Sequence, residues 1–197
     1  GFINFKLSEK FYHNNLLTII NNDDYGKINS KKNKTALIEF VSANPTGPLT
    51  VGHGRGAVLG DTISNILEWN GYNVTREYYF NNAGRQMRIL GQSVYARYQQ
   101  EYNDLIEFPE DGYQGEYIKD IAKIISDQKK NQLINNTNID LFKNYAEEFI
   151  FKNIKSTLKK IKINFDSFFN EDDLYNSGAI DEIINNLKKK NIIYDKE

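Results

Sequence analysis

The 197-residue sequence contains no cysteine, which excludes a disulfide scaffold, a metal site built on thiolates and a cysteine nucleophile. No apolar run approaches the roughly 20 residues that cross a bilayer, and no secretory signal pattern opens the chain. The 25 basic and 26 acidic residues leave a net charge of −1, which excludes a strongly basic nucleic-acid coat. Together these absences predict a soluble, cytoplasmic protein with no membrane partner.

The remaining composition is typical of a globular chain, with 40% hydrophobic and 26% charged residues. The length predicts one domain or two small ones. All the arginines fall in one stretch, although lysine is the commoner cation. Because the guanidinium fork binds phosphate or carboxylate through two donors, this stretch is a candidate binding region. The arginines are Arg55, Arg76, Arg85, Arg88 and Arg97.

The first part of the chain is lysine-rich and has little apolar patterning after residue 20. The alternation of apolar and polar residues over 1–7 predicts a strand. Ser8 is placed to cap a helix that ends at Leu17 or Ile20. The polar stretch 21–34 predicts a linker.

The second part predicts a βαβ unit. The mostly apolar run 36–41 suits a strand buried on both faces of a parallel sheet. Residues 42–49 hold two of the three prolines and are therefore irregular. A helix follows over 52–70 with Gly71 at its C-terminal end, and 72–80 is a second strand. The helix is predicted from the spacing of Val58, Ile63, Ile66, Leu67 and Trp69.

The third part predicts mainly helices, over 84–102, 113–127 and 138–162. A short strand is expected over 163–169, and a further helix begins at Ser177 and ends in three lysines. The apolar stripe of the helix 138–162 consists of Phe142, Tyr145, Phe149, Ile154, Leu158 and Ile161. Its lysines Lys152, Lys155, Lys159 and Lys160 are interpreted as a solvated surface.

Glycines cluster around the start of the helix 52–70. Glycine there lets a ligand approach the backbone and leaves helix N–H groups free for an anion. A strand-to-helix turn of this kind is where α/β sheets commonly bind nucleotide phosphates. The pattern is neither Gly-x-Gly-x-x-Gly nor a Walker loop, so it predicts nucleotide binding only in general. The glycines are Gly47, Gly52, Gly54, Gly56 and Gly60.

Two histidines are present, and they are interpreted differently. His53 lies at the mouth of the glycine-lined helix, where an imidazole donor or cation can stabilise charge on a phosphoryl group. His13 lies in a polar, lysine-bearing helix and is interpreted as a surface residue.

The stretch 39–57 resembles the signature of bacterial-type arginyl-tRNA synthetases and contains a version of the His-x-Gly-His element of class I synthetases. The stretch 76–86 is similar to the Asn-Asp-x-Gly-x-Gln segment of that family, with a weaker echo at 112–117. The resemblance implies an α/β fold: the first half of a class I Rossmann-like parallel sheet with a mainly helical insertion. Residues 1–7 resemble the end of the N-terminal additional domain of the family.

The resemblance implies ATP-dependent activation of L-arginine and its transfer to tRNA(Arg). It makes Thr50, Gly52 and His53 the ATP-binding residues, with Gly52 under the adenine and His53 at the α-phosphate. Thr50 and His53 are accordingly the expected catalytic residues. ATP is expected to bring Mg²⁺ with it, held by phosphate oxygens and water, with no protein-bound metal.

The arginine pocket implied by the resemblance is lined by Glu39, Ser42 and Asn44. Carboxylate and amide oxygens are the acceptors that a cationic amino acid requires. Two positions depart from the family pattern. Thr50 replaces the first histidine of His-x-Gly-His and can donate one hydrogen bond but carry no charge. Asn82 replaces the aspartate of the second segment, so it and Gln86 remain candidates without an assigned role.

The resemblance also implies a division into the end of the N-terminal domain with a linker (1–34), half of the catalytic domain (35–110) and a truncated helical insertion (111–197). The second half of the catalytic domain is not matched, so the chain is expected to be a fragment. We expect this chain alone to form no aminoacyl-adenylate, and arginine-dependent ATP–pyrophosphate exchange would refute that. The parent enzyme is expected to be a monomer.

Two alternatives remain open from the sequence. Another nucleotidyltransferase of the same superfamily would share the Gly-His turn, although not the Asn-Pro-Thr-Gly-Pro run ahead of it. A non-catalytic nucleotide-binding module would keep the fold without the chemistry. The joint presence of Glu39, Asn44, Gly52 and His53 argues against this second alternative.

Overall fold

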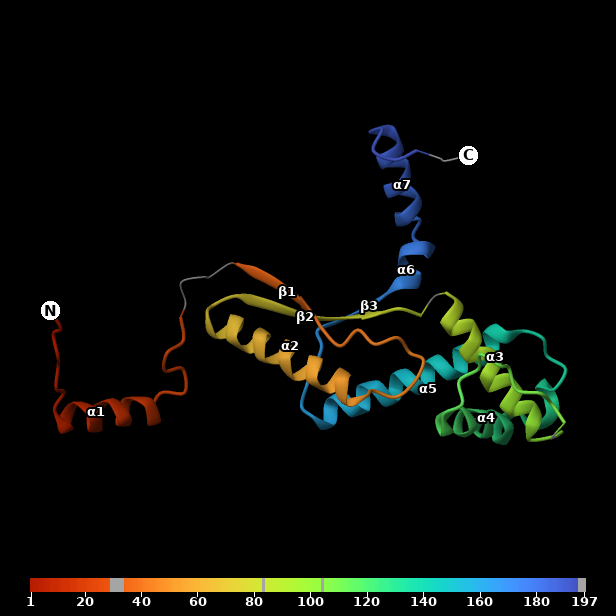
Figure 1. Ribbon diagram of the computed structural model, residues 1–197, viewed down its shortest axis with the longest axis horizontal. Helices are drawn as coiled ribbons and strands as arrows, with labels where there is room; N and C mark the ends of the chain where they lie inside the picture. The colour runs from red at the N-terminus through yellow and green to blue at the C-terminus, as the bar shows by residue number, and fades with distance from the viewer. Residues whose placement is uncertain (29–33, 83, 104, 195–197) are drawn as a thin grey trace.

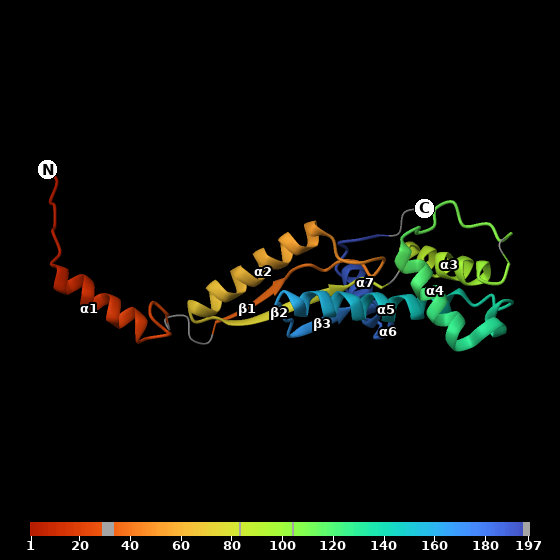
Figure 2. The same ribbon diagram turned by 90° about the horizontal axis from the view of Figure 1, so that it is seen from below.

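The computed structural model describes residues 1–28, 34–82, 84–103 and 105–194. The predicted linker 21–34 therefore falls partly outside the described residues, as does Ala83 of the second motif. The described residues of the linker, 21–28 and 34, include turns and no helix or strand. Figures 1 and 2 show an elongated chain in which an N-terminal helix stands apart from a small sheet and a group of helices.

The sheet has three parallel strands in the order β1-β2-β3. Strand β1 (Thr35–Glu39) pairs with β2 (Asn73–Phe80), and β2 pairs with β3 (Ser167–Asn170). Helix α2 (Val51–Trp69) connects β1 to β2 and packs against both strands. The predicted α/β fold with a parallel βαβ unit is therefore confirmed.

The α2 helix ends where the sequence predicts. The N–H of Gly71 donates to the Glu68 carbonyl over 2.9 Å, and the N–H of Tyr72 donates to the Leu67 carbonyl over 3.1 Å. Gly71 has φ +84°, a left-handed conformation that favours glycine. This Schellman arrangement satisfies the last carbonyls of the helix and turns the chain into β2.

Three helices form a group beside the sheet: α3 (Arg85–Gln100), α4 (Glu116–Lys129) and α5 (Ile139–Lys160), with a 3-10 turn η1 (Lys130–Leu133) after α4. Helix α3 packs on both α4 and α5. The three predicted helices are confirmed to within about three residues at each end. Helix α5 is the longest, and it reaches from the helical group to the sheet (Figure 1).

The prediction of a strand over 1–7 is wrong, because the described backbone there is in no strand and its side chains are exposed. An alternating pattern specifies a strand only when a neighbouring strand takes up the backbone groups. The prediction that Ser8 caps a helix is confirmed, because Ser8 precedes α1 (Glu9–Ile20) and accepts a hydrogen bond from the Phe11 N–H.

At the other end of the chain, β3 is shorter than its predicted range of 163–169 and ends one residue later. The helix predicted from Ser177 is α7 (Ala179–Lys189), which begins after Gly178 in the left-handed conformation. The six-residue helix α6 (Glu171–Asn176) was not predicted. It is too short to carry a periodic pattern of its own.

The core runs along α5. Its buried face repeats every four residues and packs on α3 at one end and on the aromatic side chains of β2 and β3 at the other. Of the predicted stripe, Tyr145 and Phe149 are half-buried and Ile161 is exposed. The lysine-rich face is exposed, as predicted. The buried residues of α5 are Phe142, Ala146, Ile150, Ile154 and Leu158.

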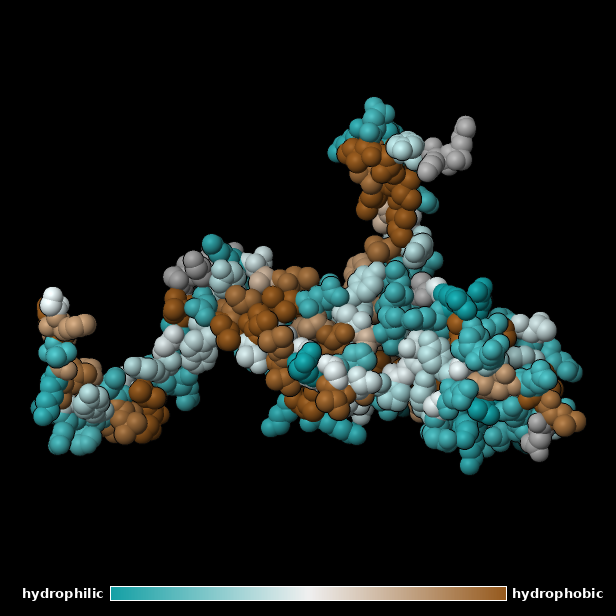
Figure 3. Space-filling view, viewed as in Figure 1, coloured by the Kyte–Doolittle hydropathy of each residue, from teal (hydrophilic) through white to brown (hydrophobic). Residues whose placement is uncertain are grey.

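Helix α2 contacts the sheet through small residues. Ala57, Gly60 and Ser64 are buried, and a Cβ atom at Gly60 would lie 2.2 Å from Cγ of Phe40. The larger apolar residues that predicted the helix lie mainly on its other side, and Figure 3 shows apolar side chains gathered over this helix. The exposed residues on this side are Val58, Leu59, Ile63, Ile66 and Trp69.

The prediction that the first strand is buried on both faces is wrong. Leu37 is 59% exposed and Glu39 is exposed, whereas Phe40, just past the strand end, is buried against α2. The reason is that β1 lies at an edge of the sheet and α2 covers only one of its faces. We call the other face, which carries Leu37, Glu39, Glu77 and Tyr79, the open face of the sheet.

The domain boundaries at 34/35 and 110/111 stay predictions. Contacts in the structure cross the second boundary in both directions, because α3 packs on α4 and α5 while β3 pairs with β2. Within the described residues, no helix combines the length and the apolar character that a membrane span requires.

Candidate functional site

The segment that carries the family-like motif is the loop between β1 and α2, residues 40–50, which we call the signature loop. It is irregular, as its two prolines predict. Val41 has φ +66° and Ser42 has φ +38°, left-handed conformations that cost free energy in residues with a Cβ atom. The Ser42 hydroxyl oxygen accepts a hydrogen bond from the Tyr79 N–H over 3.0 Å, which attaches the strained turn to β2.

Two tyrosines from other elements hold the signature loop. The Tyr78 hydroxyl donates to the Ala43 carbonyl over 2.9 Å, and the Tyr117 hydroxyl, from α4, donates to the Thr46 carbonyl over 2.6 Å. Burial raises the pKa of Tyr78 to about 12 and also raises the pKa of Tyr117. Both phenols therefore stay protonated and keep donating at physiological pH.

A third contact joins two of the predicted site residues. The Asn44 amide nitrogen donates to the Gln86 amide oxygen over 2.8 Å, although the two residues are 42 positions apart. Both side chains are exposed at the carboxyl end of the sheet. Because the amide nitrogen of Asn44 is directed at Gln86, its Oδ1 atom is left as the acceptor for another partner.

Thr50 and His53 form the N-terminal cap of α2. Thr50 is the cap residue, and its N–H donates to His53 Nδ1 over 3.0 Å while the His53 N–H faces Thr50 Oγ1 at 3.5 Å. Since Nδ1 accepts, Nε2 carries the imidazole proton and is free to donate to a ligand.

The first turn of α2 also leaves room for a ligand. Gly52 is exposed, and a Cβ atom there would meet only Thr50 Oγ1, at 3.6 Å. The first N–H groups of an α-helix have no partner within the helix and carry partial positive charge. This turn can therefore receive an anion or a flat ring against its backbone.

The open face of the sheet is acidic near the carboxyl ends of its strands. Glu39 and Glu77 are directly opposite each other in the β1–β2 register, and Ser167 Oγ donates to Glu77 Oε2 over 3.1 Å. Burial, and then the charge of Glu171, raise the pKa of the neighbouring Tyr79. Three carboxylates thus gather where a cationic ligand would be stabilised.

Sequence reasoning identified Glu39 but missed Glu77 and Glu171. Glu77 lies inside the second motif, and its placement opposite Glu39 depends on the strand register. Glu171 follows β3, whose pairing with β2 no local pattern predicts. The signal for Glu77 was its position in a predicted strand, and Glu171 had none.

Asn82, a candidate without an assigned role, is buried and held by α5. Its amide nitrogen donates to Glu147 Oε1 over 2.9 Å. Sequence reasoning missed Glu147, because only the packing of α5 brings it beside the end of β2. Within the part of the chain that the structure describes, no group of three His, Asp or Glu side chains is arranged to hold a metal ion.

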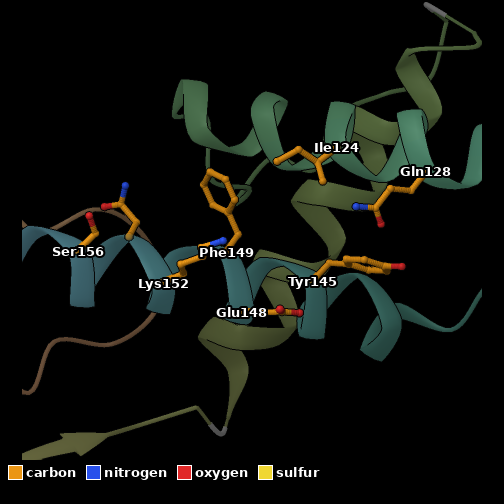
Figure 4. A pocket seen from close by; sticks show the side chains of 8 residues that line it. Ile124, Gln128, Tyr145, Glu148, Phe149, Lys152 and Ser156 are labelled. Atoms are coloured by element: carbon orange, nitrogen blue, oxygen red, sulfur yellow. The ribbon is translucent and has the colours of Figure 1, made fainter.

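Two sizeable hollows of the surface contain none of the predicted site residues. One of about 800 Å³ runs along the outer side of α2 and is lined by Val51, Gly54, Arg55, Val58, Leu59, Thr62 and Ile161. Another of about 610 Å³ lies between α4 and α5 (Figure 4) and contains none of the predicted site residues. It is lined by Ile124, Gln128, Tyr145, Glu148, Phe149, Lys152, Asn153 and Ser156.

The chain is similar to a known family of proteins along most of its length. The profile of the family described as "tRNA synthetases class I (R), catalytic domain" matches residues 15–197. Among curated relatives, the arginine–tRNA ligase of Desulfotalea psychrophila is 44% identical over 198 residues, which cover 100% of this chain and 36% of the relative. That of Prosthecochloris aestuarii is 50% identical over 179 residues, covering 90% of this chain and 32% of the relative.

Solved structures give the same result. A structure described as a putative arginyl-tRNA synthetase from Campylobacter jejuni superposes with a TM-score of 0.86 at 35% identity, covering 97% of this chain and 42% of that one. Thermus thermophilus arginyl-tRNA synthetase, with a TM-score of 0.52 at 21% identity over 80% of this chain and 27% of that one, shares the fold. The chain thus spans about a third of the length of the curated relatives it matches.

Proposed function

This chain belongs to the class I arginyl-tRNA synthetase family, and we propose that it carries the part of the active site that binds ATP and L-arginine for attachment of arginine to tRNA(Arg). The observations that carry the proposal are the Thr50–His53 cap at the mouth of α2 and the carboxylates of Glu39 and Glu77 at the strand ends, which the signature loop connects to that cap. An anion-binding helix end that one loop connects to a cation-binding surface suits a reaction between a nucleoside triphosphate and a cationic amino acid.

In this proposal, ATP binds over the first turn of α2. The exposed backbone at Gly52 accommodates the adenine, and the His53 Nε2–H donates to the α-phosphate. When the arginine carboxylate attacks the α-phosphorus and pyrophosphate leaves, negative charge builds on the phosphoryl oxygens, and a fixed donor stabilises that charge. Thr50 contributes by holding the imidazole and by closing the cap of the helix.

In the same proposal, L-arginine binds against the signature loop and the open face of the sheet. Glu39 pairs with the guanidinium group, and Asn44 Oδ1 accepts one of its N–H groups. Ser42 already accepts the Tyr79 N–H, so its part is to donate its hydroxyl hydrogen to the substrate carboxylate. Gln86 acts through Asn44, whose amide it orients.

Mg²⁺ enters this scheme with ATP. The residues around the α2 cap offer N–H and hydroxyl donors rather than a carboxylate cage, which fits a cation held by phosphate oxygens and water. tRNA(Arg) is the second substrate of the proposed reaction, and it receives the arginyl group at its 3′ end.

The binding proposal is tested with this chain by calorimetry, with ATP and L-arginine titrated separately. We expect Glu39→Gln to weaken arginine binding by about tenfold and leave ATP binding unchanged, and His53→Ala to do the reverse. Glu9→Gln and His13→Ala, both on α1, are the matched controls.

Other outcomes favour the alternatives. ATP binding without a response to arginine or any other amino acid favours a different nucleotidyltransferase. Equal effects of Glu39→Gln and His53→Ala on both ligands, through loss of stability, favour a module in which these residues are structural.

A further inference from the structure

Asn82 lies two positions beyond the end of β2, and the residue is only 7% exposed. Its amide nitrogen donates to Glu147 Oε1, from the middle of α5, over 2.9 Å. A carboxylate can only accept, so this bond fixes which way the amide points, with the nitrogen toward α5 and the oxygen away from it. The reverse orientation would place two oxygens against each other.

The oxygen of this amide is left without a partner. Asn82 Oδ1 is buried and accepts no hydrogen bond from any residue that the structure describes. Buried acceptors are rarely left unsatisfied in folded proteins, because they lose water without gaining a donor. An acceptor that is fixed in orientation by a second residue, and that stays free, points to a donor supplied by a ligand.

The surroundings identify the class of donor. Asn82 lies four positions before Gln86, which holds Asn44 at the proposed arginine site. Gly84, between them in sequence, has φ +85°, and a Cβ atom there would meet nothing within 4 Å, so there is open space at Gly84, two positions from Asn82. The side chain of L-arginine carries N–H donors and no acceptor, which matches an unsatisfied carbonyl oxygen.

We infer that Asn82 Oδ1 accepts a hydrogen bond from an N–H group of the amino-acid substrate, and that Glu147 is the positioning residue that holds the Asn82 amide for this contact. The inference rests on the proposed function. It gives α5, which lies outside both sequence motifs, an indirect part in recognition of the amino acid, through the Asn82 amide.

Glu148 provides the matched control. It is the next residue on α5, it is exposed, and its side chain lines the hollow between α4 and α5 (Figure 4). Glu147→Gln keeps an oxygen that can accept from Asn82, whereas Glu147→Leu removes it. A positioning role therefore predicts rescue by the glutamine variant and not by the leucine variant.

The test uses nuclear magnetic resonance of this chain, with L-arginine as the probe and the side-chain amides of Asn82 and Asn44 as reporters. We expect both amides to shift on titration in the unsubstituted chain, in Glu147→Gln and in Glu148→Leu. In Glu147→Leu we expect the Asn82 response to disappear and the dissociation constant for arginine to rise about tenfold.

Each result decides between the inference and the function on which it rests. A shift of Asn44 without a shift of Asn82 overturns the inference and leaves the proposed function standing. No shift of either amide overturns both. An Asn82 response that persists in Glu147→Leu shows that Glu147 does not position the amide.

Discussion

Thr50 and His53 bind each other at the first turn of α2, with the Thr50 N–H donating to His53 Nδ1 over 3.0 Å. This relationship gives a physical role to the threonine that stands where the family pattern has histidine. Threonine is a favourable residue at the N-cap of a helix because its hydroxyl oxygen accepts a hydrogen bond from a backbone N–H group of the first turn. The substitution therefore keeps the helix capped and the remaining imidazole oriented.

The first prediction concerns the tautomer of His53. Since Nδ1 accepts from Thr50, we expect the neutral ring to be protonated at Nε2, as recorded by long-range ¹H–¹⁵N correlation spectra. Thr50→Ala removes the hydroxyl of the cap and should destabilise the chain by about 1 kcal/mol in urea unfolding. His13, which is exposed on α1, is the reference ring. A neutral His53 ring with its proton on Nδ1 would contradict the hydrogen bond from the Thr50 N–H to that atom.

The second prediction concerns the contact between α2 and Phe40. A Cβ atom at Gly60 would lie 2.2 Å from the Phe40 ring, so Gly60→Ala should destabilise the chain by about 1–3 kcal/mol. Gly56→Ala is the control on the same helix, because a Cβ atom there would meet nothing within 4 Å. The control should be neutral or stabilising, by up to about 1 kcal/mol. Equal effects of the two variants in chemical unfolding would rule out the proposed contact.

The third prediction concerns Tyr78, whose pKa burial raises to about 12. Tyr78→Phe leaves the Ala43 carbonyl without its donor and should cost about 1–3 kcal/mol near pH 7. The folded chain binds the phenolic proton more tightly than the unfolded chain, where tyrosine ionises near pH 10.

The stability that Tyr78 contributes is therefore complete below about pH 10 and is lost as the pH rises through about 12. Unfolding measured across this range should show the difference between the unsubstituted chain and Tyr78→Phe becoming smaller. Tyr12→Phe, at an exposed position on α1, should show no such change. A pH-independent difference for Tyr78→Phe would speak against this linkage.

The fourth prediction concerns the ion pair that joins α2 to β2. Arg76 donates to both carboxylate oxygens of Glu68, over 2.7 and 3.0 Å, and these hydrogen bonds hold the pKa of Glu68 below its ordinary value of 4.5. Because Glu68 is partly exposed, Glu68→Gln should cost no more than about 1 kcal/mol near pH 7.

A lowered pKa places this contribution above pH 4.5, and it is lost as the pH falls through the folded value. The difference in unfolding free energy between the unsubstituted chain and Glu68→Gln should thus narrow on acidification. Glu110→Gln, at an exposed position, is the control. A difference that grows with acid would show that the pair does not behave in this way.

Much of the fold could be predicted because its signals are local. The cap at Ser8, the turn at Gly71 and the helix that joins the two strands each depend on residues close in sequence. The prediction of a strand over 1–7 is wrong because it too used only a local signal. Alternation of apolar and polar residues does not show whether a neighbouring strand is present to pair with. The exposure of Leu37 likewise depends on which elements cover the sheet.

The candidate site was predictable only where it coincides with a motif. Glu39, Asn44 and His53 were found in this way. Glu147 and Glu171 reach the site through the packing of α5 and the pairing of β3, which bring together residues far apart in the chain. Such contacts depend on tertiary structure, and no window of sequence contains them.

The position of β1 at the border of the sheet has a further consequence. Its outer N–H and C=O groups form a ready template for one more strand, because β2 pairs with its other edge. A parallel strand added there would place β1 inside the sheet. The carboxyl end of β1 would then lie at the bottom of a crevice between the segments that follow the neighbouring strands. Ligands of open α/β sheets bind in crevices of this kind, where the direction of strand succession reverses.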